Sequence, residues 1–416
     1  MKISWITPLL GTASASAGLD ISDACVVDVR DLVYKPGNRS DAIQEKIRQG
    51  VESLAQGKRV IVCCDYGMSR SNAIATGILA SVENIAFDVA LRQVQKATGE
   101  AQIKLDPLNA VRKALGLRSP AIKVNAQRSV LVTGGGGFIG TALRARLGEE
   151  FRVVAPPREQ LDVTLGSTQL DLLVNEEGIE CIVHLANPRI YTSNVAMGHS
   201  LTMLRNAIEV CLAEDIRLIY PSSWEIYSGY AGMLHADEST PALPRGPYAE
   251  TKYLSEILID HCRRTAGLRC ALLRFSPIYG PDSDRPKFIY NFIEKAKRSQ
   301  TIITHCYKNG PPALDLLHID DLVSAFIATL KAEFTGTVNI GTGVLTSTRE
   351  IAEMLRDRIG SSSRIAPAAI EAEVASIAMN WRRAETELNW RPTISLDDGL
   401  ERLLSEMTSP GDDDER

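Results

Sequence analysis

The stretch from Cys64 to Ser71 combines residue types that can do phosphoryl chemistry. It places a cysteine and an arginine, Cys64 and Arg70, with five residues between them. A thiol attacks phosphorus as a thiolate, and its pKa falls at a helix N-terminus and beside a cation. Residues 59–63 read as a buried strand and residues 72–80 as a helix, so the loop joins the two. The pattern predicts a loop that holds a phosphoryl group against the Cys64 thiolate.

The other residues of this loop are suited to binding an anion. Backbone N–H groups of residues 65–70 can turn inward onto an anion, and Arg70 can grip two phosphoryl oxygens at once. Gly67 permits the tight turn. Ser71 can donate a hydrogen bond to the thiolate when it leaves. The loop therefore predicts a catalytic set of Cys64, Arg70 and Ser71.

A second stretch has the pattern of a dinucleotide site. Gly134, Gly137 and Gly140 follow a buried strand at residues 130–132 and open a helix. Glycines at these positions allow a tight turn, close approach of a pyrophosphate, and close packing of the helix on the strand. Such a pattern is a weak signal by itself and needs companions.

Three further residues supply those companions. Tyr248 and Lys252 are four positions apart, which places both side chains on one face of a helix. An ammonium group, together with the positive nicotinamide of a cofactor, lowers the pKa of a nearby tyrosine towards neutrality. The tyrosine can then exchange a proton with a carbinol while hydride moves. Ser223 ends a strand where it can hydrogen-bond the reacting oxygen, so the set predicts NAD(P)-dependent chemistry at a carbinol.

The segment after the second strand of this region bears on the choice of cofactor. Residues 152–155 form that strand, and no acidic residue stands where a ribose 2′-hydroxyl would be held. Arg158 follows instead and can pair with a 2′-phosphate, so we favour NADP over NAD. The alternative is that Arg158 is a solvated surface arginine.

Composition limits the class of protein. The chain has 416 residues and a net charge of -5, which argues against a nucleic-acid binder because phosphates need a basic surplus. No apolar run approaches the ~18 residues of a membrane helix. Eight cysteines at irregular spacing do not form a disulfide framework, so a reducing cytoplasm is expected. Residues 3–10 are interpreted as a first strand followed by a small-residue loop, and not as a secretory signal.

The order of elements predicts two α/β domains. Residues 1–117 form a small unit, and residues 118–128 form a linker. Residues 129–408 alternate strands and helices, which predicts a Rossmann-type doubly wound parallel sheet. The less regular sequence after Gly280 predicts a small C-terminal substrate lobe. Residues 409–416 are an acidic tail that we expect to be disordered.

Residues 1–117 resemble the dual-specificity branch of the protein tyrosine phosphatases, whose loop reads His-Cys-x-x-Gly-x-x-Arg-Ser. The resemblance implies an upstream aspartate that protonates the leaving oxygen. Asp31 is the first candidate and Asp28, inside a strand, the second, whereas Asp41 is assigned to a helix cap. The family's histidine is Cys63 here, which predicts reduced activity, and two adjacent cysteines favour oxidative inactivation.

Residues 129–405 resemble the extended short-chain dehydrogenase/reductases, the NAD-dependent epimerase/dehydratase family. Beside the glycine turn and the Tyr-x-x-x-Lys pair, the resemblance is carried by His184-Leu185-Ala186, Leu273-Arg274, Tyr279-Gly280-Pro281, His318-Ile319-Asp320-Asp321-Leu322, Asn339-Ile340-Gly341-Thr342-Gly343 and Leu388-Asn389-Trp390-Arg391-Pro392. It implies that Ser223, Tyr248 and Lys252 are the catalytic triad. It also implies further cofactor contacts at Phe138, Ile139, Asp162 (the adenine-contacting position), Leu185, Ala186, and Pro277 near the nicotinamide. No residue is assigned to a metal.

The same resemblance bears on the reaction. Family dehydratases carry Thr-Asp-Glu where this chain has Ser223-Trp224-Glu225, so Trp224 replaces the acid aspartate and 4,6-dehydration is not expected. Epimerisation through a transient ketone and reduction of a keto-sugar both remain open.

The substrate-side positions depart from the family as well. Enzymes for nucleotide sugars often have Asn where Pro277 stands and Arg where Leu314 stands. Candidate replacements that could contact phosphate, or simply be surface charges, are Lys287, Lys308, Arg382 and Arg383. A nucleotide-activated sugar is the first expectation, and a sugar phosphate or another hydroxy-carbonyl compound the second.

The two signatures on one chain predict a bifunctional enzyme. A cysteine phosphatase would be fused to an NAD(P)-dependent sugar epimerase or reductase, with a homodimer expected by analogy with the reductase family. One alternative makes the N-terminal domain a phosphate-binding regulatory module. Another makes the C-terminal domain a redox sensor without turnover, against which the intact Ser223, Tyr248 and Lys252 speak.

Overall fold

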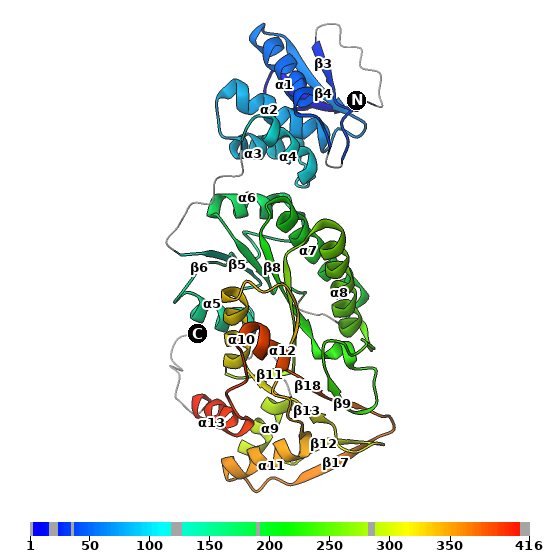
Figure 1. Ribbon diagram of the computed structural model, residues 1–416, viewed down its shortest axis with the longest axis vertical. Coiled ribbons are helices and arrows are strands. Elements are labelled where there is room, and N and C mark those ends of the chain that lie inside the picture. The colour runs from blue at the N-terminus through cyan, green and yellow to red at the C-terminus, as the bar shows by residue number, and fades with distance from the viewer. Residues whose placement is uncertain are drawn as a thin grey trace. The chain divides into compact units, whose positions relative to one another are not determined.

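A computed structural model describes residues 3–15, 24–34, 37–117, 127–188, 192–281 and 288–407. Its contacts divide the chain into two compact units (Figure 1). The first consists of Met1–Ser129, Arg158–Glu180 and Arg205–Ile216, and the second of Val130–Pro157, Cys181–Leu204 and Arg217–Arg416. Most of the expected linker, 118–126, and the whole acidic tail, 409–416, lie outside the described residues, so both stay predictions.

The first unit contains a four-stranded sheet in the order β1-β2-β4-β3. The strands are β1 Ser4–Trp5, β2 Leu10–Ser14, β3 Ala24–Asp28 and β4 Arg59–Cys64. β4 is parallel to both β2 and β3. It is buried from Val60 to Cys64, which explains its unbroken apolar sequence, because a strand covered on both faces needs no polar side.

The helices of the first unit are α1 Ser40–Ala55, α2 Arg70–Glu83, α3 Phe87–Thr98, α4 Leu105–Ala114 and α6 Thr168–Glu177. Residues 70–80 of α2 are buried throughout, so this helix is the centre of the unit. Because β4 ends at Cys64 and α2 begins at Arg70, the chemically suggestive loop leads from a buried strand directly into a buried helix.

The expectation of one N-terminal strand followed by a small-residue loop is wrong. Residues 3–10 contain only the short β1, and the small residues of Leu10–Ser14 form β2 itself. Their size has a use, because the cysteine loop packs on this strand: a Cβ on Gly67 would lie 2.8 Å from the backbone of Ala13 and Ser14.

The assignment of Asp41 as a helix cap is also wrong. The N-cap residue of α1 is Arg39, and its side chain makes no capping hydrogen bond to a backbone N–H of the first turn. Asp41 lies inside the first turn and forms an ion pair with Arg39. A carboxylate near a helix N-terminus is favourable through the helix dipole alone, so sequence pattern could not separate the two roles.

The second unit contains a six-stranded sheet in the order β15-β10-β8-β7-β5-β6. In chain order the strands are β5 Ser129–Thr133, β6 Arg152–Val154, β7 Cys181–His184, β8 Arg217–Ser223, β10 Cys270–Phe275 and β15 Gly336–Ile340. The pairs β5–β7, β7–β8, β8–β10 and β10–β15 are parallel, which confirms the doubly wound sheet. The chain leaves β5 on one side for β6 and returns on the other for β7, and ligands bind at the carboxyl ends of strands where the order reverses in this way.

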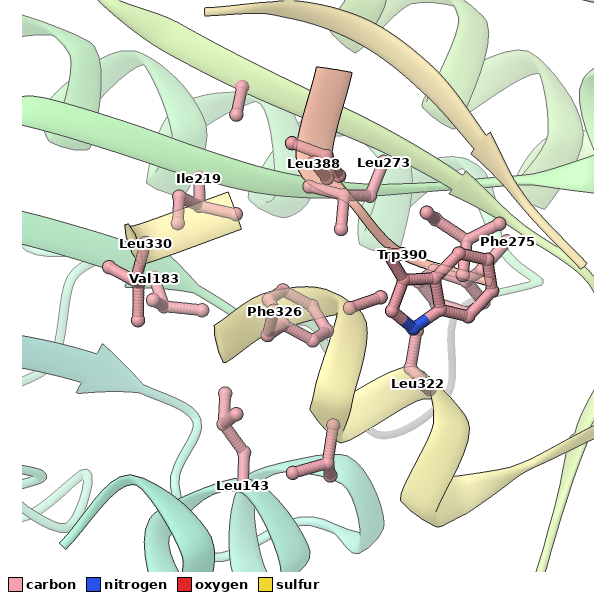
Figure 2. Close-up of a cluster of buried hydrophobic side chains, with 14 of the residues drawn as sticks. Leu143, Val183, Ile219, Leu273, Phe275, Leu322, Phe326, Leu330, Leu388 and Trp390 are labelled. Carbon is pink, nitrogen blue, oxygen red and sulfur yellow. The ribbon is translucent and has the colours of Figure 1, made fainter. Parts of the chain in front are cut away.

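Helices and apolar side chains cover this sheet. The helices of this unit are α5 Phe138–Leu147, α8 Pro247–Ala266 and α10 Ile319–Lys331, and the 3-10 turn η1 spans Trp224–Tyr227. The helix α7 Asn194–Ala213 begins in this unit and belongs to the first unit from Arg205 onward. Figure 2 shows side chains of α5 and α10 meeting those of the strands around Phe326 and Trp390. Each such buried side chain stabilises the fold by roughly 1.5–3 kcal/mol, so this cluster fixes the sheet that carries the glycine turn.

The remaining residues of the second unit form small sheets and a separate core. The strand pairs are β11 Ile278–Tyr279 with β14 Leu317–His318, β12 Ile302–Tyr307 with β17 Ile365–Ile370, β13 Ala313–Leu314 with β16 Thr346–Ser347, and β9 Gly232–Ala236 with β18 Ala375–Met379. The helices are α9 Phe288–Lys297, α11 Thr348–Ile359, α12 Arg382–Leu388 and α13 Leu396–Glu406. Side chains of α9, α11 and α13 share one core around Ile293, Leu355 and Leu403. Across the described ranges, no helix has both the length and the apolar character to cross a membrane.

Candidate functional site

The glycine turn between β5 and α5 has the geometry that a dinucleotide needs. Gly134 has φ of +71°, a conformation that favours glycine, and a Cβ there would lie 2.7 Å from the Ala186 nitrogen. A Cβ on Gly140 would lie 2.5 Å from the Gly134 carbonyl oxygen. A Cβ on Gly137, at the N-cap of α5, would have only that carbonyl oxygen within 4 Å, at 3.6 Å. The turn is therefore closed towards the protein and open at the helix N-terminus, where a pyrophosphate is favourable.

The end of β7 forms the neighbouring wall of this turn. The Leu185 N–H donates to the Thr133 carbonyl at 3.1 Å, and the Ala186 N–H donates to Thr133 Oγ1 at 3.3 Å. His184 Nδ1 lies 2.9 Å from the same Oγ1, and burial, with a smaller effect of Lys252, lowers the pKa of His184 to about 3. Leu185 and Ala186 thus lie beside the glycine turn.

The other expected cofactor contacts have varied surroundings. Phe138 and Ile139, the first residues of α5, are partly buried against the core of the sheet. The Pro277 carbonyl accepts a hydrogen bond from the Leu317 N–H at 2.9 Å, and the residue is half-buried. A Cβ on Gly280 would lie 3.7 Å from the Phe138 ring, so the Pro277–Gly280 segment lies close to the start of α5.

Arg158 and Asp162, in the first unit, pair with each other. Arg158 Nε donates to Asp162 Oδ2 at 3.0 Å, and the Arg158 side chain is 75% exposed. Burial alone would raise the pKa of Asp162, but hydrogen bonds from Thr164 and Arg158 hold it below its ordinary value. Asp162 is therefore a charged acceptor already engaged by its own segment, and the roles expected of both residues stay predictions.

Ser223, Tyr248 and Lys252 come from two neighbouring elements. Ser223 is the last residue of β8 and caps η1, because its Oγ accepts the Glu225 N–H at 3.2 Å. Tyr248 is the second residue of α8, and Lys252 follows one turn later. The Lys252 ammonium lies 5.7 Å from the centre of the Tyr248 ring. The structure therefore holds the tyrosine and the lysine on the same side of α8, beside the end of β8.

The Lys252 ammonium is buried and held by two oxygens of β8. Nζ donates to the Pro221 carbonyl at 2.7 Å and to the Tyr220 hydroxyl at 3.4 Å. Burial lowers the pKa of Lys252 to about 8, against the raising effects of Glu256 and Glu225. Lys252 is therefore protonated in most molecules at pH 7, and its charge lies close to Tyr248.

Two functional candidates, Tyr220 and Glu225, were missed by the sequence reasoning. Tyr220 binds Lys252 and stacks near His184 with ring centroids 6.3 Å apart. Burial raises the pKa of the Glu225 carboxyl, against the opposing effect of Lys252. The only signal in the sequence was proximity to Ser223, because neither the burial nor the contact with a residue of α8 is visible in the spacing.

A buried ion pair connects the elements that carry Ser223, Tyr248 and Lys252. Arg274 of β10 pairs with Glu256 of α8 at 2.7 Å, and Ser222 Oγ donates to Glu256 Oε1 at 2.5 Å. Arg274 also donates to the Tyr227 hydroxyl at 2.7 Å. Removing one partner of such a pair costs about 3–5 kcal/mol, so β8, α8, β10 and η1 are fixed together where the three catalytic candidates lie.

The cysteine loop of the first unit surrounds its thiol with donors. Cys64 Sγ lies 3.2 Å from the Gly67 nitrogen and 3.3 Å from Ser71 Oγ. Burial acts to raise the pKa of Cys64, but hydrogen bonds from the Ser71 side chain and from backbone N–H groups lower it overall. By contrast, burial raises the pKa of Cys63. The pKa values of the two adjacent cysteines are therefore shifted in opposite directions.

Arg70, the first residue of α2, is held by two backbone carbonyls and a carboxylate. Its Nη1 donates to the Leu32 carbonyl at 2.8 Å and to the Arg30 carbonyl at 3.1 Å, and its Nη2 pairs with Asp65. Its Nε is buried and has no hydrogen-bond partner in the described part of the chain. A buried donor of this kind is costly unless something binds it, which fits a loop built for an anion.

The acid candidates are engaged elsewhere. The Asp31 carboxylate pairs with Lys46 of α1 at 2.9 Å, and Asp28 pairs with Arg30 at 2.6 Å. The backbone on either side of Asp31 does approach the loop, because Arg70 bonds the carbonyls of residues 30 and 32. The structure therefore brings Cys64 and Ser71 into contact, holds Arg70 against the backbone on either side of Asp31, and leaves the Asp31 carboxylate paired with a lysine.

Two of the candidate substrate cations are engaged in ion pairs. Lys308 pairs with Glu371 at 3.2 Å and Arg383 with Glu387 at 4.0 Å, in each case with exposed side chains. Leu314 lies in β13, Arg382 begins α12, and Lys287 lies outside the described residues. Within those residues no three His, Cys, Asp or Glu side chains form a metal site.

Comparison with known proteins decides the family. The sequence model of the NAD dependent epimerase/dehydratase family matches residues 130–341. A Methanocaldococcus jannaschii protein named as a UDP-glucose 4-epimerase is 30% identical over 303 residues, which span 67% of this chain and 98% of that protein. The chain belongs to the NAD dependent epimerase/dehydratase family.

Two further similarities agree with this family. A UDP-glucuronate 4-epimerase from Thermodesulfobacterium geofontis is 27% identical over 315 residues, 66% of this chain and 94% of that protein. The structure of UDP-glucose 4-epimerase from Thermus thermophilus, in complex with NAD, superposes with a TM-score of 0.60 at 21% identity, covering 68% of this chain and 100% of that chain. The epimerase/dehydratase fold is thus confirmed for the second signature, and the family match does not include residues 1–129.

Proposed function

We propose that this chain is a bifunctional enzyme. Residues 129–408 would carry out NAD(P)-dependent epimerisation of a nucleotide-linked sugar, and residues 1–117 would hydrolyse a phosphate monoester. The observation that carries the first activity is the buried Lys252 ammonium beside Tyr248 at the end of β8. The domain boundaries, the cytoplasmic location and a homodimer belong to the same proposal.

The side chains suit proton transfer at a carbinol. The Lys252 charge favours the ionised form of Tyr248, which can then take a proton from a substrate hydroxyl and later return it. Ser223 Oγ accepts the Glu225 N–H, which leaves its own hydrogen for the substrate oxygen. A bound NAD or NADP supplies the hydride acceptor in such a reaction, and the open side of the turn at Gly136 and Gly137 offers it a place.

Epimerisation is favoured over dehydration and over net reduction. Trp224 stands where family dehydratases have an acid, so the leaving group of a 4,6-dehydration would lack its proton donor. The relatives named as UDP-sugar 4-epimerases support a UDP-linked sugar as substrate. Reduction of a keto-sugar is the alternative, and the two differ in cofactor behaviour, because an epimerase regenerates its cofactor whereas a reductase exchanges it.

The direct experiment is product analysis with two named substrates. The purified full chain is incubated with UDP-glucose or UDP-glucuronate, and the 4-epimer is quantified by chromatography. We expect conversion by the wild type and a loss of about 10²- to 10⁴-fold in Tyr248→Phe, the range that a positioned acid/base group contributes. Equal rates in the two proteins would rule out the proposed role of Tyr248.

The cofactor is tested on the protein as purified. Nucleotide released by acid is identified as NAD or NADP, and its retention through purification favours the epimerase. Arg158→Ala should weaken NADP more than NAD if Arg158 leaves Asp162 to bind a 2′-phosphate. An equal effect on both would assign Arg158 to the surface and remove the preference for NADP.

The second activity rests on the contacts of the loop: Cys64 Sγ lies 3.2 Å from the Gly67 nitrogen and 3.3 Å from Ser71 Oγ, and the buried Arg70 Nε has no hydrogen-bond partner among the described residues. The Cys64 thiolate would attack phosphorus, and the ester oxygen would leave with the proton of Asp31. Water would then displace the thiolate from phosphorus, giving its proton to Asp31 and releasing phosphate. Turnover of p-nitrophenyl phosphate by the reduced wild type, absent in Cys64→Ser, would support it. Binding of phosphate without turnover would favour the regulatory module.

A further inference from the structure

Asp65, the residue after the nucleophile, is an acidic side chain inside an anion-binding loop. Its carboxylate pairs with Arg70 Nη2, and its own carbonyl accepts a hydrogen bond from Ser14 Oγ at 2.6 Å. The Asp65 side chain is 52% exposed, whereas that of Arg70 is 6% exposed. The backbone of Asp65 is thus fixed to β2, while its carboxylate lies at the mouth of the loop.

The donors of Arg70 are divided between the protein and this carboxylate. Nη1 is occupied by the carbonyls of Arg30 and Leu32, so it has no donor to offer a ligand. The edge left for two parallel bonds to a phosphoryl group consists of Nε and Nη2. Nε has no partner within the described residues, and Nη2 holds Asp65. A phosphoryl group that binds Nη2 must therefore compete with the Asp65 carboxylate for that nitrogen.

Arg70 itself is not free to move away. Two backbone carbonyls hold it, and its guanidinium lies 4.4 Å from the centre of the Tyr34 ring. The half-exposed Asp65 side chain can rotate into water without breaking the Ser14 contact, because that contact uses the backbone carbonyl. Exchange of the carboxylate for a ligand is therefore a side-chain movement of one residue.

We propose that Asp65 is an internal counter-anion that occupies Arg70 until a phosphoryl group displaces it. This proposal rests on the phosphate-binding role of the loop. A displacing ligand must outcompete a carboxylate with one negative charge. A phosphate monoester, with about 1.5 to 2 negative charges at pH 7, does so better than a monoanionic sulfate ester or phosphodiester. Asp65 thereby lowers the apparent affinity for every oxyanion by the same factor, and only a ligand that binds Arg70 strongly displaces it.

The test compares Asp65→Asn with the wild type in the full chain. Turnover of p-nitrophenyl phosphate is inhibited with inorganic phosphate and, separately, with p-nitrophenyl sulfate. The neutral amide keeps the size of the side chain and removes the charge. We expect the inhibition constants for phosphate and for the sulfate ester to fall by the same factor, about 2- to 5-fold, the effect of one partly exposed ion pair, because the same internal competitor is removed for both.

A matched control removes an equal charge elsewhere. Glu83 is exposed at the far end of α2, roughly 20 Å from Arg70 by helix rise, and Glu83→Gln should leave both constants unchanged. If Asp65 merely positions Arg70, Asp65→Asn will weaken phosphate binding, and this opposite sign would overturn the proposal. An unchanged constant would overturn it as well.

Failure of the underlying function gives a different result. If neither the wild type nor Asp65→Asn hydrolyses the aryl phosphate or binds inorganic phosphate in equilibrium titration, the phosphate-binding role fails and the proposal with it. If the wild type is active and only the predicted tightening is missing, the role of Asp65 alone fails. Asp65→Ser, judged folded by its thermal transition, provides a second neutral variant should Asp65→Asn not fold.

Discussion

The charge of Lys252 depends on oxygens of a neighbouring strand, and Tyr220 supplies one of them. The tyrosine hydroxyl accepts from Nζ at 3.4 Å in a buried setting. Removing an acceptor from a buried ammonium disfavours its charged form. In Tyr220→Phe the pKa of Lys252 should therefore fall below its value of about 8, and the fall of kcat with rising pH should move to lower pH.

The measurement is the pH profile of kcat for the sugar reaction, compared with Tyr230→Phe. The Tyr230 hydroxyl donates to the Pro241 carbonyl at 3.0 Å and not to the lysine, so this control should keep the wild-type profile. If Tyr220→Phe lowers kcat at every pH by the same factor, Tyr220 would be a packing residue and not a group that tunes Lys252.

His184 links the same region to stability at low pH. Burial lowers its pKa to about 3, while the unfolded chain titrates near 6.5. Between these values the unfolded state binds more protons, so the stability that the neutral imidazole contributes is present above pH 6.5 and is lost as the pH falls towards 3. The free energy of unfolding should drop by up to about 1.4 kcal/mol per pH unit in this window.

The test compares denaturant unfolding of the wild type and His184→Asn between pH 4 and 8. Asparagine can still bond Thr133 but does not titrate, so the difference in unfolding free energy should change below pH 6.5 and be constant above it. Parallel curves over the whole range would show that another group causes the acid sensitivity.

At the scale of elements, the start of α5 depends on Gly140, which packs closely against the backbone, and not on Gly136, which faces open space. A Cβ on Gly140 would lie 2.5 Å from the Gly134 oxygen and 2.7 Å from Gly135 Cα, whereas one on Gly136 meets nothing within 4 Å. Because a backbone contact cannot yield as a side chain can, we expect Gly140→Ala to destabilise the fold by about 1–3 kcal/mol.

Gly136→Ala is the matched variant from the same turn and should stay within about 0.5 kcal/mol of the wild type. Urea unfolding measures both. A Gly140→Ala protein as stable as the wild type would mean that α5 can shift away from β5, and the close packing inferred here would be wrong.

Elements with strong periodicity or long apolar runs were predictable from sequence, and those decided by neighbours were not. β5, residues 60–64 of β4 and residues 70–80 of α2 are buried, and the apolar runs of the two strands indicate this in the sequence. The small residues of β2 carried no such signal, because their value lies in the close contact with Gly67, a residue far along the chain. Likewise the role of Asp41 depended on Arg39, and a charge near a helix start suits several local arrangements.

At the scale of the molecule, the order of motifs predicted the doubly wound sheet and the positions of Ser223, Tyr248 and Lys252. The spacing of a motif states which residues share a face, and a parallel sheet brings the ends of its strands to one edge. Motif spacing does not indicate which other residues contact the catalytic candidates. The roles of Tyr220 and Glu225, and the ion pair of Asp65 with Arg70, are therefore known only from the structure.

The two candidate sites use separate residues, which leads to a prediction about the whole chain. Cys64→Ser should abolish hydrolysis of phosphate esters and leave the sugar reaction intact, and Tyr248→Phe should do the reverse.

We further expect the proposed phosphatase to prefer sugar phosphates, because its fusion to a sugar enzyme keeps both activities together. The acidic Asp65 also makes the loop less basic than polyanionic lipid headgroups require. Values of kcat/KM for sugar phosphates, nucleoside monophosphates and phosphopeptides measure this preference. A phosphatase that cleaves phosphopeptides and ignores every sugar phosphate would show that the fusion does not serve one carbohydrate pathway.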